Sequence, residues 1–416
     1  MRDLNFLLLA FTIIALPYLL AQLLKLHNVI PLVVIQILVG IALGPSLLGR
    51  VAPHFFLACI DGNSISTLSG IASIAVLIFG FITGLHTDHA AFEQHGRSFF
   101  AIATASVLVP LCLGTAGGLL IGARHPEAIG AVSNPYAFAA GTGICAAVTA
   151  LPVLGAILRE MNLLGGKLAT QALAIAAFND AALWILLSVL LAQVNGVDNG
   201  NFGILIMLGG LVLHLVFMIK VVQPIFIRFV LPRAVNGKGE TALAAACACA
   251  IGSGLVTQAI GLHYIFGAFL AGVIMPRELK QSILARLETA TVSVLMPFFF
   301  AITGLRTLID LSSPLFAEVL LITLVLSIVG KVGGTAISSV MTGAAWSSAL
   351  CLGLLMQTKG LMEIVVLTVL LEKGIISQAA FSALTVMAII STVIVMPLAR
   401  LLLPSIKGRI ALRAAE

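Results

Sequence analysis

The sequence predicts an all-α membrane protein that crosses the bilayer about thirteen times. Of its 416 residues, 60% are hydrophobic and only 9% are charged. A soluble chain of this length could not hide that much apolar surface from water. The apolar stretches are mostly ~20 residues long, enough to cross the hydrocarbon core, and short polar segments with turn residues separate them.

Hydropathy places the thirteen spans at about 5–25, 30–49, 65–85, 98–121, 138–158, 166–192, 203–228, 239–259, 262–276, 288–305, 316–342, 346–371 and 378–404. The ninth span, 262–276, is short and its ends are uncertain.

The charged residues of the loops predict the orientation in the membrane. With the N-terminus outside, about fourteen Lys and Arg fall on the inner side and about five on the outer side. Cytoplasmic loops carry the excess of basic residues, so we expect a multi-pass protein of the cell (inner) membrane, N-terminus outside and C-terminus cytoplasmic. The basic residues are spread singly, which argues against a nucleic-acid partner.

One acid stands near the middle of the apolar run 166–192. Asp180, preceded by Asn179, interrupts the sequence QALAIAAFNDAALWILL. An ionised carboxylate near the bilayer midplane costs several kcal/mol unless it is compensated, so such an acid usually has a function. The alternative is a protonated or paired Asp with a structural role only.

Two lysines fall at a similar depth on other spans. Lys331 lies near the centre of the run 316–342, and Lys359 near the centre of the run 346–371. Buried Lys and Asp are each penalised, so three such groups at one depth are not expected by chance. Glu363 follows Lys359 by four residues, which predicts an ion pair on one helix face; a direct role in transport is the less favoured reading of this residue.

Two spans contain signals for a break at the same depth. Pro152 closes the sequence Thr149-Ala150-Leu151-Pro152 and would free carbonyls near residue 148. Gln357, Thr358, Lys359 and Gly360 interrupt the twelfth span. Each signal alone also fits a simple kink. Together they give two triplets of spans, the fourth to sixth and the eleventh to thirteenth, each with a broken helix second, as in the inverted repeats of secondary transporters.

Several other chemistries are disfavoured by the motifs that the chain lacks. There is no Walker-type phosphate loop, no His-Glu-x-x-His motif and no second central acid beyond Glu363 for an intramembrane protease. We expect no enzyme activity and no cofactor. A single carboxylate with hydroxyl and carbonyl neighbours suits a monovalent cation, Na+ or K+, and equally a proton, so the two can exchange at Asp180.

The sequence resembles the monovalent cation:proton antiporters of the second cation/proton antiporter family, with a sodium/hydrogen exchanger-like membrane domain. The likeness covers nearly the full length. The runs that carry it are LVGIALGPSLLG (38–49), FGFITGL (79–85), AVTALPVLGAIL (147–158), FNDAALWILL (178–187), GAFLAGVIMP (267–276), MPFFFAITGLR (296–306) and GLLMQTKGLMEIVVL (353–367).

The resemblance implies two crossed, unwound helices and an elevator-like motion of a core domain against a dimerisation domain, in a homodimer. It implies that Asp180 carries the cation and the proton, with Asn179 and Thr149 beside it, and that Lys331 offsets helix ends or pairs with an acid. Electrogenic members have two adjacent acids where this chain has Asn179-Asp180, which implies electroneutral exchange. Lys331, however, matches the electrogenic pattern.

We therefore expect one transmembrane antiporter domain over residues 1–416, without a soluble regulatory domain. Its core bundle would cover about 98–192 and 316–404, and its dimerisation helices about 5–85 and 203–305. Two other functions stay open: an organic-anion or bile-acid-like symporter of the same fold, and a non-transporting sensor or channel subunit. The sequence leaves the choice between Na+ and K+ undecided, because selectivity depends on the spacing of the coordinating oxygens.

Overall fold

The structure, a computed structural model, is nearly all helical in the part of the chain that it describes. The described residues are 2–24, 32–54, 56, 62–86, 96–161, 163, 167–195, 200–235, 239–310 and 313–415. Ten helices within them are long and apolar enough to cross a membrane. They cover Phe6–Leu23, Leu32–Val51, Ile65–His86, Arg97–Arg124, Lys167–Val194, Gly209–Ala234, Gly239–Ile260, Arg277–Arg306, Pro314–Met341 and Gln378–Leu402.

The other three predicted spans fall on shorter helices. The predicted span 138–158 is divided between α8 (Pro135–Ala147) and α9 (Leu151–Glu160). The span 346–371 is divided between α20 (Trp346–Met356) and α21 (Leu361–Glu372). The ninth is the short helix α15 (Tyr264–Ile274). The helical membrane fold is thus confirmed, whereas the count of thirteen crossings stays a prediction.

The chain forms two compact units. The first comprises residues 1–14, 58–89 and 188–302, and the second comprises residues 15–57, 90–187 and 303–416. The helix α1 (Arg2–Leu23) contributes to both, as do α10 (Lys167–Asn195) and α17 (Met296–Arg306). Every buried charged group that the sequence singles out belongs to the second unit.

The first unit packs α5 (Gly62–His86) against α15 and α14 (Gly239–Ile260). A Cβ on Gly84 would lie 2.1 Å from the carbonyl oxygen of Phe269, so these two backbones touch. The unit also contains two long helical rods with π-helical turns. The first consists of α11 (Gly200–Phe217), α12 (Gln223–Ile225) and α13 (Leu231–Val235), joined by π-helical turns at Met218–Val222 and Phe226–Val230. The second begins with α16 (Arg277–Ala290), which a π-helical turn at Thr291–Leu295 follows.

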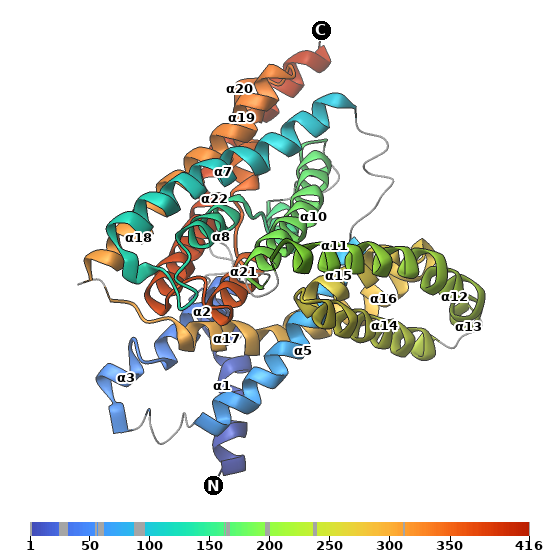
Figure 1. Ribbon diagram of the computed structural model, residues 1–416. Helices are drawn as coiled ribbons and strands as arrows, with labels where there is room; N and C mark the ends of the chain where they lie inside the picture. Colours follow the sequence, from blue (N-terminus) through green and yellow to red (C-terminus); the bar gives the residue numbers. More distant parts are fainter. Residues whose placement is uncertain are drawn as a thin grey trace. The chain divides into compact units, whose positions relative to one another are not determined.

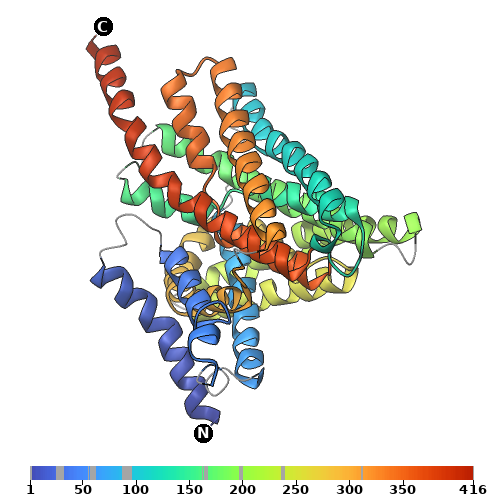
Figure 2. The same ribbon diagram turned by 90° about the vertical axis from the view of Figure 1, so that its left-hand side faces the viewer.

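The second unit is assembled around the long helix α7 (Arg97–Arg124). A second long rod lies alongside it, formed by α18 (Pro314–Ile328), a π-helical turn (Val329–Gly333) and α19 (Gly334–Met341) (Figure 1). The last helix, α22 (Gln378–Ala415), packs on α18, α20 and α21, as the turned view in Figure 2 shows. Two short N-terminal helices, α2 (Leu32–Leu43) and α3 (Leu48–Val51), complete the unit.

Small residues let α8 approach α7 at backbone distance. A Cβ on Gly118 would lie 2.6 Å from the Cα of Ala139, and one on Gly143 would lie 2.6 Å from the carbonyl oxygen of Leu111. In an apolar solvent, close packing of this kind is a principal source of helix association. This contact holds the C-terminal part of α8 against α7, and the candidate functional site lies around the C-terminal end of α8.

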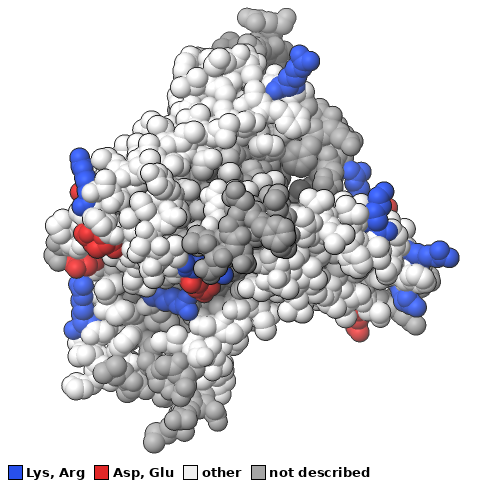
Figure 3. All heavy atoms as spheres, in the orientation of Figure 1, with Lys and Arg blue, Asp and Glu red and all other residues white. Residues whose placement is uncertain are grey.

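Charged side chains are sparse on the face drawn in Figure 3. They gather at a few places, and wide uncharged surface lies between them. Exposed apolar side chains such as Leu213 and Leu255 are ordinary for helices that face lipid, and the multi-pass membrane character of the chain follows from these helices.

The approach of α8 to α7 can be tested by adding one methyl group. In Gly143→Ala, the new Cβ would meet Thr115 Oγ1 at 2.2 Å and the Leu111 carbonyl at 2.6 Å, so the helices must separate. Overpacking of this kind costs about 1–3 kcal/mol. We expect a lower melting temperature in detergent than for Gly155→Ala, whose Cβ meets nothing within 4 Å. Equal melting temperatures for the two variants would contradict the close packing.

Candidate functional site

Two interrupted helices cross in the second unit. Helix α8 ends at Ala147 and α9 begins at Leu151, while α20 ends at Met356 and α21 begins at Leu361. The two unwound segments are joined directly, because the backbone N–H of Ala150 donates to the carbonyl of Thr358 over 2.8 Å. Unwound backbone is tolerated at membrane depth only where protein groups satisfy it, and here each break helps to satisfy the other.

The geometry of each break follows from its residues. Gly360 has φ +136°, a conformation that side chains rarely adopt, and it directly precedes α21. Pro152 is the second residue of α9, where a missing N–H costs nothing because the first N–H groups of a helix have no intrahelical partner. The side chain of Pro152 lies outside the described part of the chain. Thr149 donates to the last carbonyl of α20, Met356, at 2.8 Å.

The carbonyls at the end of α8 accept hydrogen bonds from both buried lysines. Lys359 Nζ donates to Cys145 O at 2.5 Å and to Ala146 O at 3.3 Å, and Lys331 Nζ donates to Ala147 O. The carboxyl end of a helix carries partial negative charge, so ammonium groups are stabilised there. Lys331 was expected either to offset helix ends or to pair with an acid, and the structure shows a hydrogen bond to a helix end.

Lys359 also forms an ion pair with Glu363. The Lys359 Nζ and Glu363 Oε2 atoms are 3.3 Å apart, and both side chains are completely buried. Glu363 lies in the first turn of α21, where the helix end carries partial positive charge. The pair therefore spans the crossing: its cation lies at the end of α8 and its anion at the start of α21.

Ser327 and Gln357 extend the polar contacts around the end of α8. Gln357 Nε2 donates to Ser327 Oγ at 3.2 Å, and Ser327 Oγ donates to Ala146 O at 3.4 Å. Ser327 precedes Lys331 by four residues and so lies on the same helix face, a spacing from which the sequence could have identified it. Thr358 instead donates to Leu355 O in its own segment, at 2.7 Å.

Asp180 and Asn179 lie on α10 and are buried, with 0% and 2% of their surface exposed. Neither carboxylate oxygen of Asp180 has a hydrogen-bond donor among the described residues. Lys331 interacts with Asp180 electrostatically but forms no direct ion pair with it within the described part of the chain. A fully buried carboxylate whose oxygens are both unpaired can accept a proton or coordinate a cation.

Asn179 joins the acid's helix to the crossing. Its amide is 3.1 Å from Thr149 Oγ1 and 3.0 Å from Ser106 Oγ on α7. With its oxygen turned toward Lys331, it also accepts from Nζ at 3.1 Å. The sequence singled out Asn179, Thr149 and Lys331, and the structure brings all three together. Ser106 was missed because a lone Ser in an apolar span has no signature of its own.

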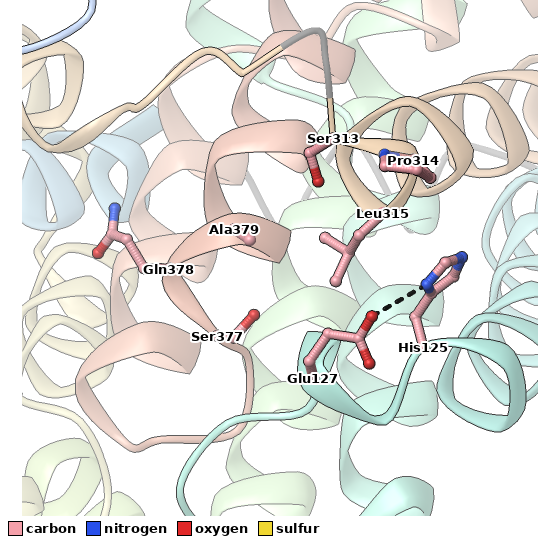
Figure 4. A pocket seen from close by; sticks show the side chains of 8 residues that line it. All are labelled: His125, Glu127, Ser313, Pro314, Leu315, Ser377, Gln378 and Ala379. Atoms are coloured by element: carbon pink, nitrogen blue, oxygen red, sulfur yellow. Dashed lines mark hydrogen bonds and ion pairs between the residues drawn. The ribbon is translucent and has the colours of Figure 1, made fainter.

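A separate pocket, lined by both polar and apolar side chains, lies at the ends of α7, α18 and α22 (Figure 4). It has a volume of about 540 Å³ and is lined by His125, Glu127, Ser313, Pro314, Leu315, Ser377, Gln378 and Ala379. Its lining includes none of the buried charged groups near the two helix breaks. His125 Nε2 bonds to Glu318 at 2.8 Å and Nδ1 to Glu127 at 3.2 Å, and Arg124 pairs with Glu318.

Fold and site together define a polytopic membrane protein with two crossed, interrupted helices, the architecture of secondary transporters. The chain belongs to the sodium/hydrogen exchanger family, since the model of that family's transmembrane region matches residues 7–401. The membership confirms the resemblance that the sequence motifs indicate.

Known relatives agree with this assignment. The chain is 34% identical to cation/H+ antiporter 20 of Arabidopsis thaliana over 88% of its own length but only 45% of that protein, so it spans about half the length of this relative. It is 30% identical to the Na+/H+ antiporter NhaS4 of Synechocystis sp., covering 88% of this chain and 90% of that one. The sodium proton antiporter MjNhaP1 of Methanocaldococcus jannaschii has the same fold, with a TM-score of 0.56, 15% identity and coverage of 97% and 95%.

Removing one member of the buried ion pair should destabilise the protein unequally. Lys359→Met leaves Glu363 unpaired and two carbonyls of α8 without their donor, whereas Glu363→Gln leaves Lys359 bound to those carbonyls. Breaking a buried pair costs about 3–5 kcal/mol, and we expect Lys359→Met to be the more damaging variant. Melting temperatures in detergent test this, and a larger loss for Glu363→Gln would contradict the role of Lys359 at the helix end.

The cluster at His125 predicts a pH-dependent stability. Its hydrogen bonds to Glu318 and Glu127 raise the pKa of His125 above the ordinary 6.5. The pKa of Glu127 lies below the ordinary 4.5, first because the backbone N–H of Glu127 donates to its carboxylate and then because of the hydrogen bond with His125. The stabilisation by His125 is thus present below pH 6.5 and is lost as the pH rises through the raised value.

We therefore expect His125→Gln to lower the melting temperature most between about pH 5 and pH 6.5, where the imidazolium and its carboxylate partners are all charged. The difference from the unmodified protein should shrink at higher pH. His54→Gln, which changes an exposed histidine outside this cluster, serves as the control. A difference for His125→Gln that grows with pH would contradict the charged pairing.

Proposed function

We propose that the chain exchanges a monovalent cation, Na+ or K+, for H+ across the membrane, with Asp180 binding the two in turn. The observation that carries this proposal is the completely buried carboxylate of Asp180, which has neither a hydrogen-bond donor nor an ion pair among the described residues and whose neighbour Asn179 contacts the helix breaks. Family membership and the antiporters among the known relatives support it.

The groups around Asp180 suit a weakly charged ion. Thr149 and Asn179 supply neutral oxygens, and among the described residues no second carboxylate is hydrogen-bonded to them. The second buried acid, Glu363, is already paired with Lys359. A divalent ion usually takes several carboxylates, so one available acid with neutral oxygens favours a monovalent ion or a proton.

The buried charges support electroneutral exchange. Lys359 and Glu363 cancel, which leaves Asp180 and Lys331 as the groups that set the charge of the loaded site. If Lys331 keeps its proton, Asp180 with a bound monovalent cation and Asp180 with a bound proton carry the same net charge. Moving the site across the membrane in either state then transports equal charge, and the voltage does no net work over the cycle.

All the groups proposed to bind or support the ion lie in the second compact unit and within about 98–192 and 316–404, which supports an elevator-type motion of these residues as a core. The core over about 98–192 and 316–404, the dimerisation helices over about 5–85 and 203–305, and the homodimer belong to this proposal. So does the placement in the cell membrane with the N-terminus outside.

Exchange in proteoliposomes tests the proposal. A pulse of Na+ or K+ should collapse a preset pH gradient in liposomes with the unmodified protein, and Asp180→Asn should reduce the rate to that of empty liposomes, since an amide cannot alternate between a proton and a cation. Asp310→Asn, the same substitution in the segment after α17, should keep the normal rate. Exchange that persists in a correctly inserted Asp180→Asn variant would refute the role of Asp180.

The same liposomes test the charge balance. A K+ and valinomycin clamp sets the voltage while Na+-driven or Li+-driven proton movement is followed. Equal rates at zero and at an imposed voltage are expected for one-for-one exchange, and rates that change severalfold with 100 mV would indicate net charge movement.

A further inference from the structure

The hydroxyl of Ser106 lies against the amide of Asn179. Ser106 is on α7, is completely buried, and its Oγ is 3.0 Å from the Oδ1 atom of Asn179 and 2.8 Å from the carbonyl of Ala103 in its own helix. Asp180 and Asn179 belong to α10, so this contact ties the helix of the acid to the helix on which α8 packs. Neither the motifs nor the crossing assigns a role to it.

The two ends of the Asn179 amide have different neighbours. One end lies 3.0 Å from Ser106 Oγ and 3.3 Å from Ile175 O, and the other lies 3.1 Å from both Lys331 Nζ and Thr149 Oγ1. If the nitrogen faced Lys331, two donors would meet. With the oxygen facing Lys331, the nitrogen can donate to Ser106, and Ser106 can donate to Ala103. Both ends of the Asn179 amide and the hydroxyl of Ser106 are then satisfied.

Which end of the amide faces the crossing decides what Asn179 can bind. An amide oxygen can coordinate a cation and accept from an ammonium group, whereas an amide nitrogen can do neither. The amide rotates at little cost unless its outer end is held, and buried polar groups are held by hydrogen bonds. Ser106 is the side chain that reaches the outer end.

We propose that Ser106 is a positioning residue for the exchange reaction: by accepting from the nitrogen of Asn179, it keeps the amide oxygen directed at Lys331, Thr149 and the transported cation. The inference rests on the proposed function. It makes a specific claim about cation affinity, since loss of the hydroxyl frees the amide to turn without removing the carboxylate that carries the proton.

Cation-dependent exchange in proteoliposomes distinguishes positioning from structural support. For Ser106→Ala we expect the KM for Na+ or K+ to rise about five- to tenfold, the size of one buried hydrogen bond, with the maximal rate within about twofold of normal. Ser106→Thr keeps the hydroxyl and should restore the KM to within about twofold. Ser98→Ala, the same substitution at an exposed position of α7, should leave both parameters unchanged.

A double substitution tests whether Ser106 acts through the amide. In an Asn179→Ser background the amide is absent, so adding Ser106→Ala should change the KM by less than about twofold. A full five- to tenfold effect in that background would overturn the proposal. So would an unchanged KM in Ser106→Ala, or a lower maximal rate at unchanged KM.

The outcomes separate this inference from the proposed function. If the unmodified protein exchanges neither Na+ nor K+ for protons, the proposed function fails whatever the variants do. If it exchanges them and Ser106→Ala behaves like Ser98→Ala, the exchange stands and the positioning role of Ser106 is refuted.

Discussion

The arrangement of the site depends on how the unwound end of α8 is satisfied. A helix that stops in apolar surroundings leaves its last carbonyls without donors, and each unsatisfied group there costs several kcal/mol. Here Lys359 donates to Cys145 and Ala146, and Lys331 donates to Ala147. The same contacts solve the opposite problem, because a buried ammonium group also needs strong acceptors. Two groups that would each destabilise the fold alone are compatible with it together.

This pairing determines where the remaining charges act. With Lys359 bound to α8 and to Glu363, both are committed to the scaffold of the crossing. Lys331 is directed at a carbonyl and at Asn179, which leaves the carboxylate of Asp180 without a direct partner among the described residues. In the proposed exchange, a direct ion pair would compete with the cation for the acid. Because Lys331 lies nearby but donates to another acceptor, its positive charge stabilises the ionised carboxylate of Asp180 without occupying the carboxylate oxygens.

Much of this was predictable from the sequence, for reasons that residue type alone supplies. Charged residues are so unfavourable in an apolar span that Asp180, Lys331 and Lys359 mark the site without any knowledge of the fold. The breaks were predicted in the same way, from Pro152 and from the polar run ending at Gly360. The i, i+4 spacing of Lys359 and Glu363 predicted a pairing that the structure contains at 3.3 Å.

The contacts between helices could not be predicted in this way. They depend on how each helix is rotated and how near its neighbour comes, and both are set by packing. Gly143 and Gly118 fix α8 on α7, and a Cβ on Gly330 would lie 2.7 Å from the Cα of Pro110 on α7, so the segment bearing Lys331 also approaches that helix closely. The sequence contains these glycines but does not say which backbone each one touches. Ser106 gains its neighbour only once these approaches are fixed.

The nature of residue 179 then follows from its surroundings. Its side chain lies between Lys331 and Thr149 on one side and Ser106 on the other. A carboxylate there could accept from the lysine but could not donate toward Ile175, and it would add a second negative charge beside Asp180. An amide offers an acceptor at one end and a donor at the other with no net charge. Asn179 can therefore join three helices of the site while Asp180, unlike Glu363, has no ion pair in the described part of the crossing.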